Sequence, residues 1–254
     1  MKIAAQLYTV REYTQNEKDF AETIKKIAAI GYPGVQISAQ SQSIPAKFIA
    51  DTCAASGIEI ASSHAPPPRI LNDIEKLIDE HKLYKCPQIG IGMIPDEYRA
   101  NLAGVKKFIS DYLPSAKKIK EAGLRFAYHN HEYEFEKFDG KLIIEHLIDG
   151  FAEADMQVIL DTYWVQAGGG DPVFWIKKLA GKIPRIHVKD MVIVDRQQRN
   201  AEIGAGNLNW PSIIEACRAS GVEWLMVEQD DCYGQNPFNS LQKSYAFLND
   251  KINN

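Results

Sequence analysis

The sequence predicts an α/β protein folded as a single (β/α)8 barrel over residues 1–254. Short runs rich in β-branched residues alternate eight times with segments whose apolar residues recur every three or four positions. Several of the later runs end in His, Asp or Glu, as is typical of strands whose carboxyl ends line the mouth of a barrel. Repeated strand–helix alternation indicates a parallel sheet, and eight units in this length indicate closure.

In the first half of the chain, glycines mark the end of three expected helices, at Gly31, Gly57 and Gly123. The long helix before Gly123 contains Pro114, where we expect it to bend. The strands are expected at residues 3–8, 34–38, 58–64 and 88–93, and the helices at residues 20–28, 45–56, 72–83 and 97–122.

The second half repeats this alternation. Asp171 and Pro172 form a clear helix start, because Asp caps free backbone N–H groups and Pro fits the first helical position. The strands are expected at residues 125–131, 158–161, 186–189 and 224–229, and the helices at residues 142–151, 171–180, 210–220 and 238–248.

A doubly wound open sheet is the alternative fold. It is disfavoured because the first strand is followed by Leu7-Tyr8-Thr9-Val10-Arg11 and not by a glycine-rich phosphate loop. The chain shows no linker, no low-complexity tract and no second domain. One barrel is therefore the prediction.

The composition describes an ordinary globular protein, with 45% hydrophobic and 24% charged residues. A net charge of −4 disfavours a nucleic-acid partner. No apolar run is long enough to cross a bilayer and no signal peptide is evident, so we expect no membrane partner and a cytoplasmic location. The four cysteines lack CxxC spacing and are expected to be free thiols. A homo-oligomer is compatible with the sequence, but the oligomeric state cannot be predicted from it, because the outer helical faces carry no unmistakable apolar stripe.

The most informative stretch is Arg125-Phe126-Ala127-Tyr128-His129-Asn130-His131-Glu132-Tyr133-Glu134-Phe135. It begins as an apolar strand and ends in imidazoles and carboxylates. Because side chains alternate along a strand, His129 and His131 lie on the same face. Three later strands end in the same way, at residues 158–161, 185–190 and 224–230.

Asp161, His187 and Glu228 lie at the ends of consecutive strands. Together they form a mixed nitrogen and oxygen site that suits Mn²⁺, Zn²⁺, Co²⁺ or Mg²⁺. Each has a simpler explanation, for Asp161 a helix cap and for His187 a hydrogen-bonded interior histidine. A cap is disfavoured because no helix start is expected directly after Asp161. A buried, unpaired carboxylate at Glu228 would need a cation or a proton.

The motifs resemble the sugar phosphate isomerase/epimerase family of the xylose-isomerase-like TIM-barrel superfamily, which includes inosose dehydratases, ketose 3-epimerases and endonuclease IV. The similarity runs from the first strand to the last helix and is more specific in the second half. The segments that carry it are Gly31-Tyr32-Pro33-Gly34-Val35-Gln36, Tyr128-His129-Asn130-His131, Leu160-Asp161-Thr162-Tyr163-Trp164, His187-Val188-Lys189-Asp190, Gly204-Ala205-Gly206-Asn207-Leu208-Asn209-Trp210 and Val227-Glu228-Gln229-Asp230.

The resemblance implies one divalent metal ion held by Glu, Asp, His and Glu from strands five to eight. Asp161, His187 and Glu228 match the last three positions. The first position falls at His129, an imidazole where the family has a carboxylate. Glu134, just beyond the strand, is the alternative ligand, and a surface carboxylate is its simpler interpretation.

The resemblance also implies proton transfer beside a carbonyl, in which the metal ion polarises a ketone and stabilises an enediolate. Glu134 and His131 are the candidates for the base. His64 and Lys189 are expected to bind or polarise substrate oxygens, with a solvated loop or surface ion pair as the alternative.

Two departures from the superfamily bear on the reaction. Gln36 stands where many relatives carry glutamate, and an amide can hydrogen-bond a hydroxyl but cannot abstract a proton. Trp164 stands where endonuclease IV has a metal-binding histidine, which disfavours cleavage of abasic DNA. Trp164 and Tyr8 are candidates to stack on a sugar ring, although packing in the core is the simpler role of an aromatic side chain.

The leading hypothesis is a divalent-metal-dependent isomerase or epimerase of a carbohydrate or cyclitol ketone. The second is a lyase or dehydratase acting on a keto-sugar or an inosose. The third is a sugar-binding barrel without catalysis, because Gln36 and His129 replace two carboxylates of the superfamily. A phosphorylated substrate is not implied, because only residues 204–207 form a glycine-rich turn of the kind that binds phosphate.

Overall fold

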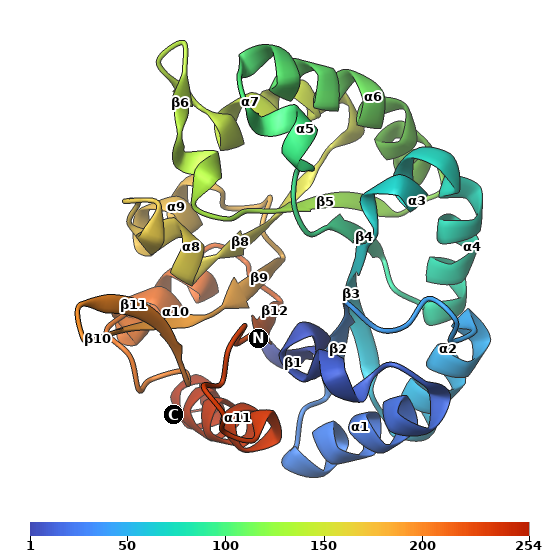
Figure 1. Ribbon diagram of the computed structural model, residues 1–254, viewed down its shortest axis with the longest axis vertical. Helices are drawn as coiled ribbons and strands as arrows, with labels where there is room; N and C mark the ends of the chain where they lie inside the picture. The colour runs from blue at the N-terminus through green and yellow to red at the C-terminus, as the bar shows by residue number, and fades with distance from the viewer. Residues whose placement is uncertain (254) are drawn as a thin grey trace.

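Eight parallel strands close into a barrel in the computed structural model, which describes residues 1–253 (Figure 1). Going round the barrel, the strand order is β1-β12-β9-β8-β5-β4-β3-β2. The strands are β1 Lys2–Gln6, β2 Gly34–Ile37, β3 Glu59–Ala65, β4 Gln88–Ile91, β5 Arg125–His129, β8 Gln157–Asp161, β9 Arg185–Val188 and β12 Trp224–Val227. The predicted (β/α)8 fold is confirmed.

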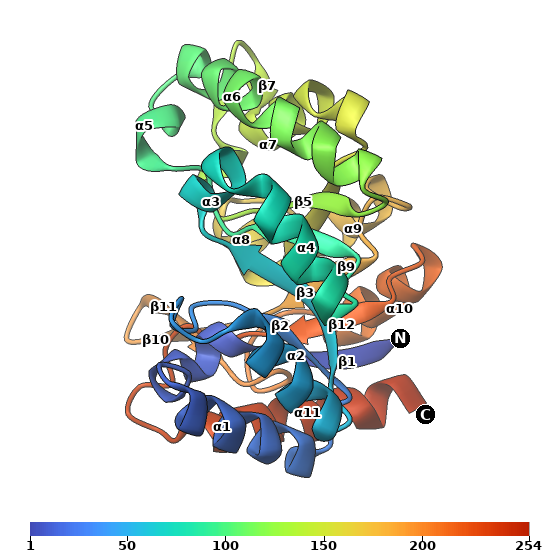
Figure 2. The same cartoon turned by 90° about the vertical axis from the view of Figure 1, so that its right-hand side faces the viewer.

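Eight helices surround the barrel, and shorter elements sit in the loops. The main helices are α1 Glu17–Ile30, α2 Ala46–Ala55, α4 Ile74–Tyr84, α6 Leu102–Glu121, α7 Ile143–Gly150, α9 Pro172–Lys178, α10 Trp210–Ala219 and α11 Pro237–Asn253. The short elements are η1 Leu7–Tyr13, α3 Pro67–Asn72, α5 Asp96–Arg99, η2 Tyr133–Phe135, η3 Ala152–Ala154, α8 Thr162–Ala167 and the hairpins β6 Lys137–Phe138 with β7 Lys141–Leu142 and β10 Asp190–Val194 with β11 Gln197–Ala201. Figure 2 shows α5 and hairpin β10–β11 on the side of the barrel opposite the N-terminus.

Several predicted boundaries differ from the structure, and one helix was not predicted. The fifth strand, expected to reach His131, ends at His129. The first strand ends at Gln6, so Tyr8 belongs to the 3-10 helix η1. The fourth predicted helix is divided into α5 and α6. The side chain of Asn101 accepts a hydrogen bond from the N–H of Gly104 and so caps the start of α6. Pro114 lies within α6. A further helix, α8, begins directly after Asp161.

The barrel interior is filled in layers, which places the polar groups at one end. At the amino ends of the strands, the ring of Trp224 lies against Gly34, where a Cβ would be 2.6 Å from the ring. A small apolar cluster extends from Trp224 into the barrel and comprises Ala4, Ala61, Ala127, Ile159, Trp224 and Met226. Imidazoles and carboxylates then occupy the carboxyl ends of the strands, the usual place for chemistry in this fold. Among the described residues, no helix has both the length and the apolar character needed to span a membrane.

Candidate functional site

Four buried side chains from four adjacent strands converge at the carboxyl end of the barrel. They are His129 of β5, Asp161 of β8, His187 of β9 and Glu228, which directly follows β12. One ligand atom from each lies within 4.8 Å of the corresponding atom of every other member. The strand register brings them together, since Asp161 and His187 are paired neighbours in β8 and β9. The structure thus groups the four residues that we predicted as metal ligands.

The imidazole of His129 is oriented by a backbone carbonyl. Nδ1 of His129 lies 2.9 Å from the oxygen of Gly92, which can only accept, so Nδ1 carries the hydrogen. Nε2 then presents its lone pair 3.3 Å from Oδ2 of Asp161. Residue 92 is also tightly packed, because a Cβ there would lie 3.0 Å from Nδ1 of His64.

His187 is oriented in the same manner by Gln36. Nε2 of His187 lies 2.6 Å from the amide oxygen of Gln36, so Nε2 donates and Nδ1 is left with its lone pair. Nδ1 lies 3.0 Å from Oε2 of Glu228 and 3.6 Å from Oδ2 of Asp161. Both imidazoles therefore direct acceptor atoms at carboxylate oxygens, an arrangement that needs a positive charge or a proton between them.

Neighbouring polar groups also fix the two carboxylates. Gln6 donates from its amide nitrogen to Oε1 of Glu228 over 2.9 Å, which leaves Oε2 for the site. Oδ1 of Asp161 accepts from the backbone N–H of Trp164 and so caps α8. Our expectation that Asp161 is not a cap was wrong: one oxygen caps the helix while the other, Oδ2, faces the imidazoles. Asn130 accepts from the Asp161 N–H and holds its backbone.

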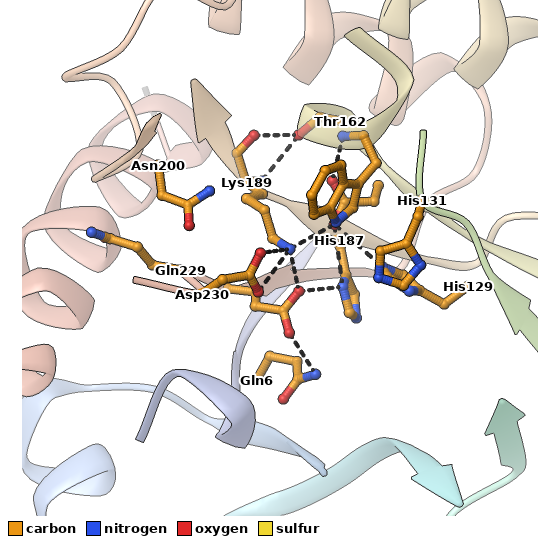
Figure 3. A network of polar contacts seen from close by, with 12 residues as sticks. Gln6, His129, His131, Thr162, His187, Lys189, Asn200, Gln229 and Asp230 are labelled. Carbon is orange, nitrogen blue, oxygen red and sulfur yellow. Dashed lines mark hydrogen bonds and ion pairs between the residues drawn. The ribbon is translucent and has the colours of Figure 1, made fainter. Parts of the chain in front are cut away.

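Lys189 and Asp230 complete the charged network (Figure 3). Lys189 is 1% exposed, and its Nζ lies 2.8 Å from Oε2 of Glu228, 2.9 Å from Oδ2 of Asp230 and 3.3 Å from Oδ2 of Asp161. Three carboxylates thus share one ammonium group. When both imidazoles are neutral, the three carboxylates and the one ammonium group leave the site two positive charges short of neutrality.

The pKa values reflect this shortage of positive charge. Burial alone would raise the pKa values of Asp161 and Glu228, but the Lys189 ammonium and the imidazoles hold both well below their usual range. Burial acts to lower the pKa of His187, yet Glu228 and Asp161 raise it above its ordinary value. Burial and the Glu228 carboxylate raise the pKa of Asp230 to about 6. Without a cation, His187 therefore tends to take up the balancing proton.

These residues fit a divalent metal ion. Two imidazole nitrogens and two carboxylate oxygens form a mixed donor set, and the two missing positive charges match one divalent cation. Hydrogen-bonded partners orient the ligand groups from behind, as is usual around metal-binding histidines. A proton and a metal ion would compete for the same lone pair on Nδ1 of His187, so metal binding here should weaken in acid.

A cavity of about 600 Å³, which we term the inner cavity, opens above the four residues. Its walls include the predicted substrate-binding residues His64, Tyr8 and Trp164, together with His131 and Lys189. Within the described residues, the buried atoms Nε2 of His64 and Nε1 of Trp164 have no hydrogen-bond partner. Both groups belong to side chains of the cavity wall and lack a partner within the protein. Gln36 is absent from the cavity wall and instead holds His187.

Glu134 is in neither of the two places that we expected, the protein surface and the inner cavity. It is fully buried, accepts from the backbone N–H of His131 over 2.8 Å and receives a hydrogen bond from the hydroxyl of Tyr128. It is also outside the group of four convergent ligand residues. Burial raises its pKa to about 8. Glu134 therefore holds the segment that carries His131.

Three groups that shape the site were not predicted from the sequence. Asp230 lies two residues after Glu228, and the alternation of a strand could have placed both on one face. Gln6, a polar residue ending an apolar strand, carries a weaker signal of the same kind. The carbonyl of Gly92 could not have been found, because a backbone oxygen leaves no mark in the sequence.

The fold and the site together describe a barrel with a buried cluster that could hold a metal ion beneath a cavity, and comparison with known proteins identifies the family. The family model described as xylose isomerase-like TIM barrel matches residues 24–251, so the chain belongs to this family. None of the curated proteins matches the chain in sequence.

Solved structures share the fold at low sequence identity. A sugar phosphate isomerase/epimerase from Parabacteroides distasonis is 22% identical, with a TM-score of 0.82 over 97% of this chain and 93% of that one. An L-ribulose 3-epimerase is 14% identical, with a TM-score of 0.78 over 100% and 95% of the two chains. A probable 3-DHS dehydratase from Bacillus anthracis, involved in petrobactin synthesis, is 13% identical, with a TM-score of 0.76 over 98% and 99%.

Proposed function

We propose that this barrel is a divalent-metal-dependent enzyme that moves a proton at the carbon beside the carbonyl of a sugar or cyclitol ketone. Isomerisation or epimerisation is the leading reaction. The observation that carries the proposal is the buried quartet His129, Asp161, His187 and Glu228 beneath the inner cavity. The similarity to an isomerase/epimerase, an epimerase and a dehydratase agrees with enzymatic activity.

The quartet would hold the metal ion, and two imidazole ligands favour Zn²⁺, Co²⁺ or Mn²⁺ over Mg²⁺. A divalent ion bound there supplies a Lewis acid that polarises a carbonyl oxygen and makes the adjacent C–H more acidic. The groups that support it are already in place, because Gln36, Gln6 and the Gly92 carbonyl orient three of the four ligands. Little reorganisation is needed for binding.

Proton transfer falls to side chains in the cavity wall. His131 lines the cavity wall and is the candidate base, because its imidazole can accept a proton from a carbon made acidic by the neighbouring carbonyl. Burial lowers its pKa to about 3, so the imidazole is neutral but weakly basic. Lys189 has its pKa raised by the surrounding carboxylates and stays charged, so its positive charge can stabilise an oxygen that gains negative charge. His64, with Nε2 unpartnered, is placed to bind a hydroxyl.

Elimination, as in a lyase or dehydratase, is the second candidate. Epimerisation uses an acid–base group on each face of the reacting carbon, whereas elimination needs one base and an acid at the leaving group. Gln36 cannot abstract a proton and Glu134 is outside the cavity, so neither of these residues provides a carboxylate base there. Besides Glu228 of the quartet, the described wall of this cavity carries one carboxylate, Asp230, which favours elimination over an epimerisation by two carboxylates.

The test is NMR of metal-loaded protein in D₂O with ketoses, inososes and 3-keto-glycosides. Epimerisation or isomerisation should replace one C–H beside the carbonyl with C–D, and elimination should give an unsaturated or cleaved product. Asp161→Asn and His131→Gln should abolish either result. If a ligand raises the melting temperature but no exchange or product appears, the chain is a sugar-binding barrel and the enzymatic proposal is wrong.

A further inference from the structure

A second cavity adjoins the inner one. It has a volume of about 560 Å³ and is lined by Met93, Asp96, Arg99, His131, Glu132, Tyr133, Glu136 and Trp164. We term it the outer cavity. Met93, His131 and Trp164 line both cavities, so the two spaces meet at these three side chains. Each cavity has the size of a small-molecule site, and the pair is suited to a substrate of two parts.

The junction between the cavities is aromatic. The rings of His131 and Tyr133 are stacked with centroids 5.4 Å apart and an angle of 10° between their planes, and the ring of Trp164 lies 5.2 Å from that of His131. The indole N–H of Trp164 is buried and has no partner among the described residues. Aromatic faces beside a free N–H donor are suited to a polyhydroxylated ring, which has apolar C–H faces and hydroxyl edges.

The charge of the outer cavity is negative. Its wall carries the carboxylates of Asp96, Glu132 and Glu136 against the single guanidinium of Arg99. Arg99 is already paired with Asp96 at 2.6 Å and lies over the ring of Tyr133 at 4.6 Å. The wall of the outer cavity therefore carries an excess of negative charge, which disfavours a phosphate, while the carboxylates of Glu132 and Glu136 can accept hydrogen bonds from hydroxyl groups.

We propose that the outer cavity is a second subsite, which binds an uncharged sugar joined by a glycosidic bond to the ketone-bearing sugar in the inner cavity. This inference rests on the proposed function. The substrate class is then a neutral keto-glycoside, not a free monosaccharide and not a sugar phosphate. The junction at Trp164 and His131 places the glycosidic bond between the two cavities.

The experiment measures binding of three ligands to metal-loaded protein by calorimetry. They are a keto-monosaccharide, a neutral disaccharide with the same keto-sugar as one ring, and that disaccharide with a phosphate on its second ring. The neutral disaccharide should bind at least about tenfold more tightly than the monosaccharide, because it adds hydrogen bonds to charged acceptors. The phosphorylated disaccharide should lose that gain.

Variants of the outer wall provide the second arm. In Glu132→Ala/Glu136→Ala, the ratio of disaccharide to monosaccharide affinity should fall towards one. In Glu132→Lys/Glu136→Lys, the phosphorylated ligand should gain affinity over the neutral one. Glu121→Ala, an exposed position on α6, is the matched control and should keep the wild-type ratio.

Equal binding of the monosaccharide and the neutral disaccharide, with no effect of the wall variants, would overturn the second subsite and leave the proposed function intact. Preferred binding of the phosphorylated ligand by the wild type would overturn the neutral substrate class. If none of the three ligands binds, the proposed function fails and the subsite fails with it.

Discussion

The hydrogen bond from His187 to Gln36 determines which imidazole nitrogen faces the site. Because the amide oxygen of Gln36 accepts a hydrogen bond from the N–H of Nε2, Nδ1 keeps its lone pair and directs it at the carboxylates. Gln36, which from the sequence looked like a substrate-binding residue that had lost its acidity, therefore acts on a ligand residue. A glutamate there could accept the same hydrogen bond.

We accordingly expect Gln36→Leu to weaken metal binding by about 10–100-fold, the usual effect of losing a partner behind a metal-binding histidine. Gln36→Glu should bind metal at least as well as the wild type, because a carboxylate also accepts from Nε2. Competition against a chelator of known affinity measures both. Wild-type affinity in the leucine variant would show that Gln36 does not orient His187.

Glu134 should make stability depend on pH. Its folded pKa of about 8 is above its unfolded value, so the folded state binds the proton more tightly. Its stabilising contribution is complete below the unfolded pKa, about 4.3, and is lost as pH rises through about 8. Glu134→Gln cannot ionise. The melting temperature of this variant should therefore rise relative to wild type between pH 5 and pH 9.

The comparison uses chelator-treated protein, so that metal binding does not contribute. Glu121→Gln, at an exposed site on α6, serves as the control and should follow the wild type at each pH. A difference in melting temperature between Glu134→Gln and wild type that stays constant from pH 5 to pH 9 would contradict the raised pKa.

Among the loops, the segment after hairpin β10–β11 depends on one carboxylate. Asp190 is fully buried at the start of β10 and accepts hydrogen bonds from the backbone N–H groups of Gly204, Gly206 and Leu208 and from the indole N–H of Trp210. Residues 204–207 form the glycine-rich turn that the sequence suggested as a phosphate site. Its backbone N–H groups instead bind the Asp190 carboxylate.

Asp190→Ala should lower the free energy of unfolding by roughly 3 kcal/mol or more, because several buried N–H donors lose a charged acceptor. Urea denaturation, with midpoint and slope both fitted, measures the change. Asp79→Ala, at an exposed carboxylate on α4 with a weak ion pair to Lys82, is the matched control and should change stability little. A loss under about 1 kcal/mol in Asp190→Ala would show that the loop is held by other contacts.

Element order could be predicted from the sequence, but loop structure could not. Strands and long helices were found because their apolar periods extend over many residues. The four residues of α5 and the six of α8 carry no such period. The start of α8 was missed because Asp161 was assigned to the site alone, although one carboxylate can cap a helix with Oδ1 and face the site with Oδ2.

Closure of the barrel explains why four residues spread over a hundred positions could be grouped from sequence. Parallel strands all present their carboxyl ends at one rim, so His129, Asp161, His187 and Glu228 had to be neighbours once the eightfold alternation was recognised. The orientation of the individual side chains could not be predicted. The inward burial of Glu134 and the role of Gln36 depend on hydrogen bonds between distant segments, which periodicity does not encode.

The two ends of the barrel should respond separately to mutation. Gly34 lies against Trp224 at the amino ends of the strands, and a Cβ would sit 2.6 Å from the Trp224 ring. Gly34→Ala should cost about 1–3 kcal/mol of stability through overpacking. Metal affinity, set at the opposite rim, should stay within about twofold of wild type. Chemical denaturation and metal titration of the same sample test this, and a large loss of affinity would show that the ends are coupled.

The most direct test of the account is elemental analysis of the purified protein, of His129→Ala and of Glu134→Ala. We predict one equivalent of a divalent transition metal per chain in the wild type, its loss in His129→Ala and its retention in folded Glu134→Ala. Loss of the metal in Glu134→Ala together with its retention in His129→Ala would show that Glu134, and not His129, is the metal ligand. A wild-type protein that binds no divalent metal, even after incubation with Zn²⁺, Mn²⁺ and Co²⁺, would contradict the metal centre and the chemistry that we derive from it.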